Sequence, residues 1–290
     1  MSTLQTAAPA DVQPDLQLHL LSPDIGAEIN NLDVRNLSDV AFQRIKDALE
    51  RHHLIVIREQ DLTNDDIERF ATRFGAVEQH VFRQADGTVL GNVHRVSNLD
   101  ANGQPSVQPY NTANYYWHSD KAYLPRPSWI TMLYGVEIPP EGGDTQFVNM
   151  RTAYSTLPET TRREIDGLRL INNFDYMIET TGMKPRTAQE KAKSPPVEHP
   201  IVRTDAAGHK SLFVTMYAQE VVGMPLAQGR ALLDRLIAHA TQPSGVFTFK
   251  WRRHDLVFWN NRALNHRAVA NYDMVKYRRL LQRIVVRGEN

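Results

Sequence analysis

The sequence predicts a mainly β fold with flanking α-helices, in which short antiparallel strands form a jelly-roll or a barrel. From about residue 90 onward, short apolar runs are separated by turns rich in Pro, Gly and Asp. Strands do not alternate with helices in βαβ order, and neither an internal repeat nor a GxGxxG loop occurs. The 290 residues suffice for one large domain, which we place at 17–290, after a leader at 1–16 that we expect to be disordered.

The N-terminal part contains two predicted strands and two predicted helices. "LQLHLLS" (16–22) alternates apolar and polar residues as a strand does. Residues 38–52 begin with a Ser N-cap and repeat apolar residues at helical spacing. A buried strand, "LIVIRE" (54–59), separates this helix from a second one at 62–75, which ends at a glycine.

The remainder of the chain predicts short strands with isolated helices between them. Two β-rich runs around a Gly-containing turn at 199–214 are typical of a hairpin. The polar, Pro-interrupted stretch 176–198 is long for a connection between packed elements, and we expect either a lid or a mobile insertion there. Further helices are expected at 152–168 and 225–242, and strands at 129–138, 145–150, 246–251, 255–261 and 280–287.

Composition limits the classes of function. The chain carries 33 basic and 33 acidic residues, and this balance, without a basic run, disfavours a nucleic-acid binder. The absence of cysteine removes disulfides, thiolate metal sites and cysteine nucleophiles, and it suits a reducing cytoplasm. We find no secretory signal and no apolar stretch long enough for a membrane span, so we expect a soluble, cytoplasmic protein.

The stretch "NYYWHSDKAY" places His118 and Asp120 one residue apart. In an extended strand, residues i and i+2 point to the same face, so both side chains can reach one metal ion. Chance is the competing interpretation, because a chain with 11 histidines produces such a pair easily. His266, just after the predicted strand at 255–261, is a candidate third ligand, although a lone histidine is more often a packed or surface residue.

The choice of metal follows from the ligand types. Two imidazoles and one carboxylate on one face of an octahedron leave three positions open, which is the arrangement of non-haem Fe(II) oxygenases. The open positions can hold a bidentate co-substrate together with O2. A structural zinc site would more often close its coordination sphere, usually with thiolates that this chain lacks.

Residues downstream suit an anionic co-substrate. Thr145 begins a predicted strand after the Gly-Gly turn of "PPEGGD". If "YRRLLQR" is extended, Arg279 and Arg283 share a face, and their planar guanidinium groups suit a dicarboxylate. The alternative is a solvated strand face with surface ion pairs, which contribute little energy.

Taken together and in this order, "WHSD", "GGDT", "WNNRALNH" and "RRLLQR" resemble the Fe(II)/2-oxoglutarate-dependent dioxygenases of the TauD/TfdA family, named after taurine dioxygenase and 2,4-D dioxygenase. The likeness extends through "RFGAVEQH" and "HPIVRT", so it covers the chain from about residue 20. The resemblance implies a double-stranded β-helix, which is a cupin-like jelly-roll.

The resemblance also implies roles for individual residues. His118, Asp120 and His266 would bind the iron. Thr145 and Arg279 would hold the distal carboxylate of 2-oxoglutarate, whose 2-oxo-acid end chelates the metal.

Three further positions match substrate-side positions of the family. His80 and Asn114 would contact the substrate, and Arg283 would lie near the iron, available to an anionic substrate group or to the proximal carboxylate of 2-oxoglutarate. The segment between His266 and Arg279 is longer than the family's usual spacing, which leaves Arg278 as the alternative to Arg279.

The implied activity is hydroxylation of a small organic acid, such as an aryloxyalkanoate or an alkylsulfonate, with Fe(II), 2-oxoglutarate and O2 and with release of succinate and CO2. Where the hydroxylated carbon bears oxygen, nitrogen or sulfur, the product collapses and the outcome is cleavage. Asp120 argues against a halogenase, in which a small residue leaves room for chloride. The alternatives are a hydroxylase of an amino acid or secondary metabolite, a non-catalytic jelly-roll that binds metal or ligand, and a zinc hydrolase. The resemblance further implies a homo-oligomer, either a dimer or a tetramer.

Overall fold

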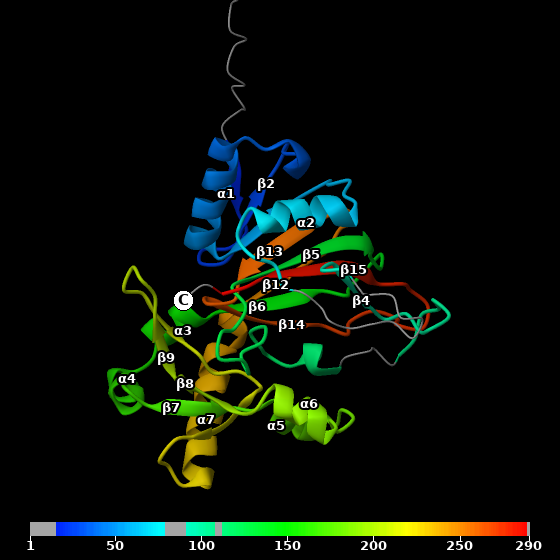
Figure 1. Cartoon of the computed structure of the whole chain (residues 1–290). Helices are drawn as coiled ribbons and strands as arrows, with labels where there is room; N and C mark the ends of the chain where they lie inside the picture. The colour runs from blue at the N-terminus through cyan, green and yellow to red at the C-terminus, as the bar shows by residue number, and fades with distance from the viewer. Residues whose placement is uncertain (1–15, 79–90, 108–111, 289–290) are drawn as a thin grey trace, which may run out of the picture.

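A large sheet dominates the computed structural model, which describes residues 16–78, 91–107 and 112–288 (Figure 1). Every neighbouring pair in this sheet is antiparallel except β2 and β3. The leader prediction for residues 1–16 falls almost entirely outside the described part of the chain. Across the sheet, the strands are β1 (Leu18–Leu20), β2 (Ala27–Ile29), β3 (Leu54–Ile57), β13 (Leu256–Asn260), β5 (Ile130–Glu137), β15 (Leu280–Val286) and β4 (His94–Ser97).

A three-stranded sheet lies against the large one and completes a sandwich. Its order is β12 (Val246–Phe249), β6 (Thr145–Asn149) and β14 (Leu264–Ala268). Figure 1 shows these strands beneath β13, β5 and β15. Phe147 from the small sheet and Trp259 from the large one belong to a single buried apolar cluster between the sheets. Packing two sheets through a shared apolar layer is the architecture that the strand pattern predicts.

Two helices cover the outer face of the large sheet, as their sequence signals predict. In α1 (Asp39–His52) the Ser38 side chain accepts the backbone N–H of Ala41. In α2 (Asn64–Thr72) Thr63 and Asp66 form a reciprocal capping box. The apolar sides of both helices pack on this face through edge-to-face aromatic contacts, among them Phe42–Phe70, Phe70–Phe74 and Phe74–Phe258.

A second apolar cluster lies below the sandwich, around helix α7 (Leu226–Ala240). The expected helix at 152–168 is wrong as one element, because it divides into α3 (Met150–Ser155) and α4 (Glu159–Ile165). Pro158 is the cause, since proline disfavours a helical residue before it and has no N–H to continue the ladder. The strands here are β7 (Arg169–Asn172), β8 (Val197–Pro200), β11 (Ala218–Val221) and the hairpin β9 (Val202–Thr204) with β10 (Lys210–Leu212).

Residues 176–198 contain more regular structure than the sequence predicted. Helix α5 (Phe174–Thr181) ends at Gly182 in the left-handed conformation, and α6 (Ala188–Lys193) begins with a capping box. Arg186 joins them by donating twice to the Asp175 carboxylate, at 3.0 Å each. The stretch is therefore partly helical, and both interpretations of it, a lid or a mobile insertion, stay predictions.

The other strand predictions in the sandwich, at 129–138, 145–150, 246–251, 255–261 and 280–287, are confirmed as β5, β6, β12, β13 and β15. Short 3-10 helices occur at η1 (Val34–Asn36), η2 (Thr112–Tyr115) and η3 (Pro243–Gly245). None of the helices in the described ranges combines the length and the apolar character that crossing a membrane requires.

Candidate metal centre

Two distant histidines meet through a pair of backbone hydrogen bonds. The His118 N–H donates to the His266 carbonyl at 3.0 Å, and the His266 N–H donates to the His118 carbonyl at 2.8 Å. The two imidazole rings consequently lie 4.2 Å apart between centroids. From the sequence pattern we expected His266 just after a strand, but it lies inside β14, where ladder hydrogen bonds to β6 hold it.

Asp120 completes the cluster from a turn. His118 forms only an isolated bridge, so the expected strand through 118 and 120 is wrong, although both side chains still point to one place. Asp120 Oδ1 lies 3.9 Å from His118 Nε2, and Asp120 Oδ2 lies 3.8 Å from His266 Nε2. Because metal–ligand bonds are about 2.1 Å long, two ligands of one ion can be up to about 4.2 Å apart, so these separations suit a shared ion.

The protonation state of the cluster also suits a metal. Burial lowers the pKa of both His118 and His266, so both imidazoles are neutral near pH 7, which is the form that binds metals. The His118 Nδ1–H donates to the Tyr116 carbonyl at 2.7 Å, and this leaves Nε2 as the free ligand atom. All three residues are more than nine-tenths buried. The residues present therefore fit a divalent cation.

Arg283 lies directly against the carboxylate of this cluster. Its guanidinium is 2.7 Å from Asp120 Oδ1. Burial alone would raise the pKa of the Asp120 carboxyl, but Arg283, the two histidines and the Thr131 hydroxyl together outweigh burial and hold that pKa well below its usual range. Asp120 is accordingly ionised at any physiological pH.

Another arginine, just before β15, is buried. Arg279 immediately precedes β15, and Leu281, two residues on, belongs to the apolar layer between the sheets. Alternation along the strand therefore points Arg279 and Arg283 to that same side, as the sequence predicted. Arg279 is 7% exposed, and its Nε–H donates to the Gly143 carbonyl at 2.9 Å.

The Gly-Gly turn shapes the place where Arg279 lies. Gly143 has φ +68°, and a Cβ there would come within 3.0 Å of the Arg279 side chain. Thr145 follows at the start of β6 and is 3% exposed. Its hydroxyl oxygen accepts the indole N–H of Trp251 at 2.9 Å, a partner that the sequence analysis missed. Because the Trp251 indole is the donor in this hydrogen bond, the Thr145 hydroxyl hydrogen remains available to a ligand.

Arg278, the alternative to Arg279, lies on the surface. Its guanidinium makes two hydrogen bonds to the Glu137 carboxylate, at 2.6 and 2.9 Å, and its side chain is 41% exposed. The two neighbours in sequence therefore face opposite environments. The competing interpretation of a solvated ion pair applies to Arg278 and does not apply to Arg279.

Aromatic side chains lie near the cluster. Tyr123 packs on Phe174 and on Tyr217, with ring centroids 4.5 and 4.9 Å apart. Burial raises the pKa of Tyr123 to about 12, so its phenol keeps its proton. Tyr123 follows Asp120 closely in the chain, whereas no local signal marks Phe174 or Tyr217, which arrive from β7–α5 and the β10–β11 connection.

Two predicted substrate contacts remain, Asn114 and His80. Asn114 is half-buried in η2, four residues before His118, and its contact with a substrate stays a prediction. His80 lies outside the described residues.

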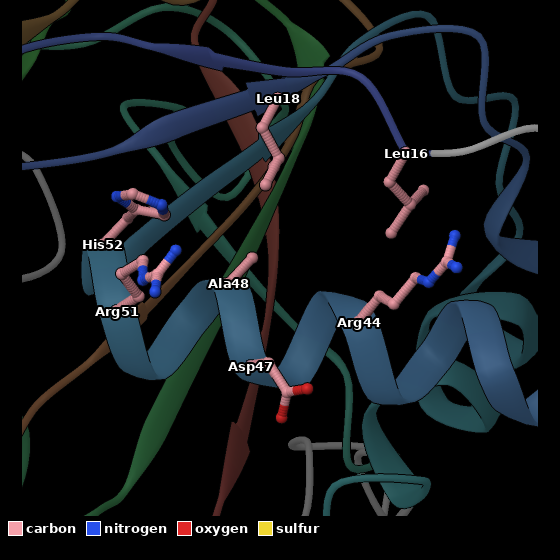
Figure 2. A pocket seen from close by; sticks show the side chains of 7 residues that line it. All are labelled: Leu16, Leu18, Arg44, Asp47, Ala48, Arg51 and His52. Atoms are coloured by element: carbon pink, nitrogen blue, oxygen red, sulfur yellow. The ribbon is translucent and has the colours of Figure 1, made fainter.

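A hollow of about 500 Å³ opens on the outer surface between β1 and α1 and is unrelated to this cluster (Figure 2). In Figure 2, the side chains of Leu16 and Leu18 point towards α1, on which Ala48 lies between Arg44 and Arg51. None of its lining residues was predicted to bind metal, co-substrate or substrate.

Comparison with known proteins identifies close likenesses over nearly the whole chain. The family model described as "Taurine catabolism dioxygenase TauD, TfdA family" matches residues 17–285. The alpha-ketoglutarate-dependent 2,4-dichlorophenoxyacetate dioxygenase of Cupriavidus pinatubonensis is 34% identical over 273 residues, which cover 90% of this chain and 94% of that protein. An alkylsulfatase of Acinetobacter baylyi is 31% identical, with 94% of this chain and 86% of that protein covered.

Solved structures of dioxygenases are also similar to this chain. The crystal structure of AAD-2 in complex with Mn(II) and N-oxalylglycine aligns with a TM-score of 0.84 and 32% identity, covering 95% of this chain and 98% of that one. A taurine dioxygenase from Burkholderia xenovorans aligns with a TM-score of 0.77 and 30% identity, covering 95% and 92%. The predicted jelly-roll fold is therefore confirmed, with sheets that do not close into a barrel.

Proposed function

This chain belongs to the TauD/TfdA family of Fe(II)/2-oxoglutarate-dependent dioxygenases, and on that premise we propose that it hydroxylates a small aryloxyalkanoate-like acid. An alkylsulfonate is the second candidate substrate. The products besides the hydroxylated acid are succinate and CO2. Hydroxylation at a carbon that bears oxygen or sulfur would cleave the substrate. The observation that carries the proposal is a buried His–Asp–His cluster, in a chain that also buries Arg279 and packs Tyr123 on Tyr217.

We assign the metal to His118, Asp120 and His266. Their ligand atoms all lie within 4.8 Å of one another, and the tautomer of His118 frees Nε2. Bound Fe(II) supplies the activation of O2 and the oxidation of an unactivated C–H bond, for which side chains alone have no chemistry. The protein's contribution is to hold the cation with three ligands, to leave positions for co-substrate and O2, and to exclude bulk water.

We assign the distal carboxylate of 2-oxoglutarate to Arg279 and Thr145. A buried guanidinium that contacts a neutral carbonyl gains most from a carboxylate, because a bidentate pair compensates its lost hydration. The Thr145 hydroxyl adds one donor, since Trp251 already satisfies its oxygen. Burial lowers the pKa of Arg279, as expected for a cation that lacks an anion.

The substrate class rests on charge and shape together. Arg283 brings positive charge to the metal side, although Asp120 shares it, and Asn114 and His80 are proposed as further polar contacts. Tyr123, Phe174 and Tyr217 offer rings for an apolar body. An acid with an aromatic group satisfies both features better than a small alkylsulfonate does. The two named relatives act, by their names, on an aryloxyacetate and on alkyl sulfates.

The test is a succinate-release screen with the full chain, reconstituted anaerobically with Fe(II) and 2-oxoglutarate and then exposed to O2. We expect substrate-dependent succinate with at least one aryloxyalkanoate, and a weak visible charge-transfer band before O2 is added. Preference for alkylsulfonates, or for amino acids or other metabolites, would replace the proposed substrate class. Activity with Zn(II) that ignores 2-oxoglutarate would overturn the proposal in favour of a hydrolase. Ligand binding without a charge-transfer band or turnover would favour a non-catalytic binding protein.

We also propose a cytoplasmic homo-oligomer, a dimer or a tetramer. The absence of cysteine supports the location, and the family resemblance supports the assembly. Light scattering on a size-exclusion column tests the assembly, and a monomer at micromolar concentration would contradict it.

A further inference from the structure

A closed ring of hydrogen bonds surrounds Asp120. Its backbone N–H donates to Asn261 Oδ1 at 3.2 Å. The Asn261 Nδ2–H donates to Thr131 Oγ1 at 2.9 Å, and the Thr131 hydroxyl donates in turn to Asp120 Oδ2. Two side chains thus fix both the backbone and the carboxylate of one residue.

The orientation of the Asn261 amide leaves no ambiguity in this ring. Its oxygen receives two donors, the Asp120 backbone N–H and the Trp259 indole N–H at 3.2 Å. An amide flipped by 180° would place its NH2 against both donors. The NH2 group must therefore face Thr131, and the Thr131 hydroxyl hydrogen must point at Asp120.

Asn261 joins three segments that are far apart in the sequence. Its backbone N–H donates to the Trp129 carbonyl at 2.8 Å, and its carbonyl accepts the Ser119 hydroxyl at 2.8 Å. Thr131 is 0% exposed in β5, and Asn261 is 3% exposed in the turn between β13 and β14. The position of Asp120 is consequently set by the interior of the large sheet, although Asp120 itself lies in a turn.

The ring constrains how the carboxylate can turn. The Thr131 hydroxyl donates to Oδ2, while Arg283 contacts Oδ1 at 2.7 Å. Donors on both oxygens prevent rotation about the Cβ–Cγ bond, because any turn would stretch one hydrogen bond while shortening the other. Partners that orient a ligand in this way usually change metal affinity 10- to 100-fold when they are removed.

We propose that Thr131 and Asn261 are positioning residues that hold Asp120 in its metal-binding orientation. The inference rests on the proposed role of His118, Asp120 and His266 as the metal ligands. Any buried hydroxyl needs a partner, so a purely structural role is the competing account. The two accounts differ in what removal of the Thr131 hydroxyl does to metal affinity at constant fold.

Thr131→Val tests the difference, because valine keeps the shape of threonine and lacks the donor. The measurement is the Mn(II) dissociation constant of the metal-free full chain, with circular dichroism and Tm recorded alongside. We expect Thr131→Val to weaken Mn(II) binding roughly 10- to 100-fold, and Thr131→Ser, which keeps the hydroxyl, to restore most of it. Mn(II) binding by folded Thr131→Val that equals the wild type would overturn the proposal.

Thr215→Val is the matched control, since Thr215 is 1% exposed and its hydroxyl accepts the Tyr217 backbone N–H, with no contact to Asp120. It should lower Tm without changing the Mn(II) dissociation constant, and an equal loss of affinity there would also overturn the inference. If Thr131→Val does not fold, Thr131→Ala against Thr131→Ser gives the same comparison. His118→Ala separates the two proposals. If His118→Ala and Thr131→Val both bind Mn(II) as the wild type does, the metal assignment fails. If His118→Ala loses Mn(II) binding while Thr131→Val keeps it, only the positioning role fails.

Discussion

Two arginines, Arg283 in β15 and Arg279 just before it, lie in opposite electrostatic situations. Arg283 contacts the Asp120 carboxylate at 2.7 Å, and although burial lowers its pKa, Asp120 raises that pKa above the ordinary value. Arg279 donates to the neutral Gly143 carbonyl, and burial lowers its pKa. Among the residues that the structure describes, no carboxylate forms an ion pair with Arg279.

The difference separates a charge that is ion-paired within the chain from a charge that has no ion pair among the described residues. A buried ion without an ion-pair partner costs several kcal/mol, and at Arg279 the nearby Tyr272, Tyr115 and Asp144 offset only part of the effect of burial. At Arg283 the same cost is offset within the chain by Asp120. The Arg279 end is therefore the place where a free dicarboxylate should bind, while the Arg283 end depends on the metal cluster.

The largest expected effect comes from breaking the metal end. His118→Ala should abolish retention of Fe(II), because one of three ligands is lost and the remaining two cannot hold the ion against chelation. The measurement is the iron content after desalting, together with Mn(II) titration. His19→Ala, on the exposed strand β1, is the matched histidine control and should retain iron. Iron content unchanged in His118→Ala would remove the basis of the comparison.

The next largest effect tests the ligand end directly. Arg279→Ala should raise the 2-oxoglutarate concentration needed for half-maximal succinate release about 100-fold, because truncating one member of a buried charge pair costs 2–5 kcal/mol. Arg278→Ala should change it less than about twofold, since its surface pair with Glu137 contributes little. The reverse result would show that the assignment is off by one residue.

The same comparison predicts an effect on stability with the opposite sign. Arg279→Met should raise the Tm of the ligand-free protein, because it removes an unpaired buried charge while keeping an apolar side chain in the same space. Added 2-oxoglutarate should raise the Tm of the wild type and leave that of Arg279→Met unchanged. A lower Tm for the ligand-free variant would mean that Arg279 is already satisfied within the fold.

Acid sensitivity should come from histidine and not from either arginine. Burial, together with Arg203, lowers the pKa of His199 to about 4, while its Nδ1 accepts from Arg203 at 3.1 Å. Since the pKa of His199 is lower in the folded state than in the unfolded one, the unfolded chain binds more protons. The free energy of unfolding therefore decreases as the pH decreases. The contribution of His199 is complete above about pH 6.5 and declines towards pH 4, with about 2 kcal/mol lost at pH 5.

Urea unfolding at pH 7.5 and pH 5 measures this loss. His199→Gln should be less stable at pH 7.5 but should lose less between the two pH values than the wild type does. An equal loss in both proteins would exclude His199 as the source. His53, whose pKa burial also lowers to about 4, would then be the next candidate.

The smallest expected effect concerns the hydrogen bond between Trp251 and Thr145. Trp251→Phe removes the donor that occupies the Thr145 oxygen, so the hydroxyl is no longer directed at the co-substrate. One hydrogen bond contributes about 1 kcal/mol, so the 2-oxoglutarate requirement should rise about fivefold with kcat little changed. Trp117→Phe is the control, because Trp117 stacks on Arg267. An equal rise in the control would attribute the effect to general loosening.

Local signals in the sequence determined much of this protein. The Ser38 cap predicted the start of α1, because a capping hydrogen bond depends only on residues three apart, whereas the Thr63 capping box of α2 was not predicted. Strand alternation predicted that Arg279 and Arg283 share a face. The ordered motifs predicted the family and hence the fold and the cofactors, and the comparisons confirm them.

Only the tertiary structure decided how these parts meet. The pairing of His118 with His266 depends on backbone bonds between residues 148 positions apart, and the ring through Asn261 and Thr131 joins three segments that no local pattern connects. Arg278 and Arg279 are adjacent residues of the same type, and the sequence does not separate them. In the structure Arg278 lies on the surface beside Glu137, and Arg279 lies in the interior beside Gly143. The physical reason is that propensity and capping act over a few residues, whereas burial and the pairing of buried charges depend on which distant segments fold together.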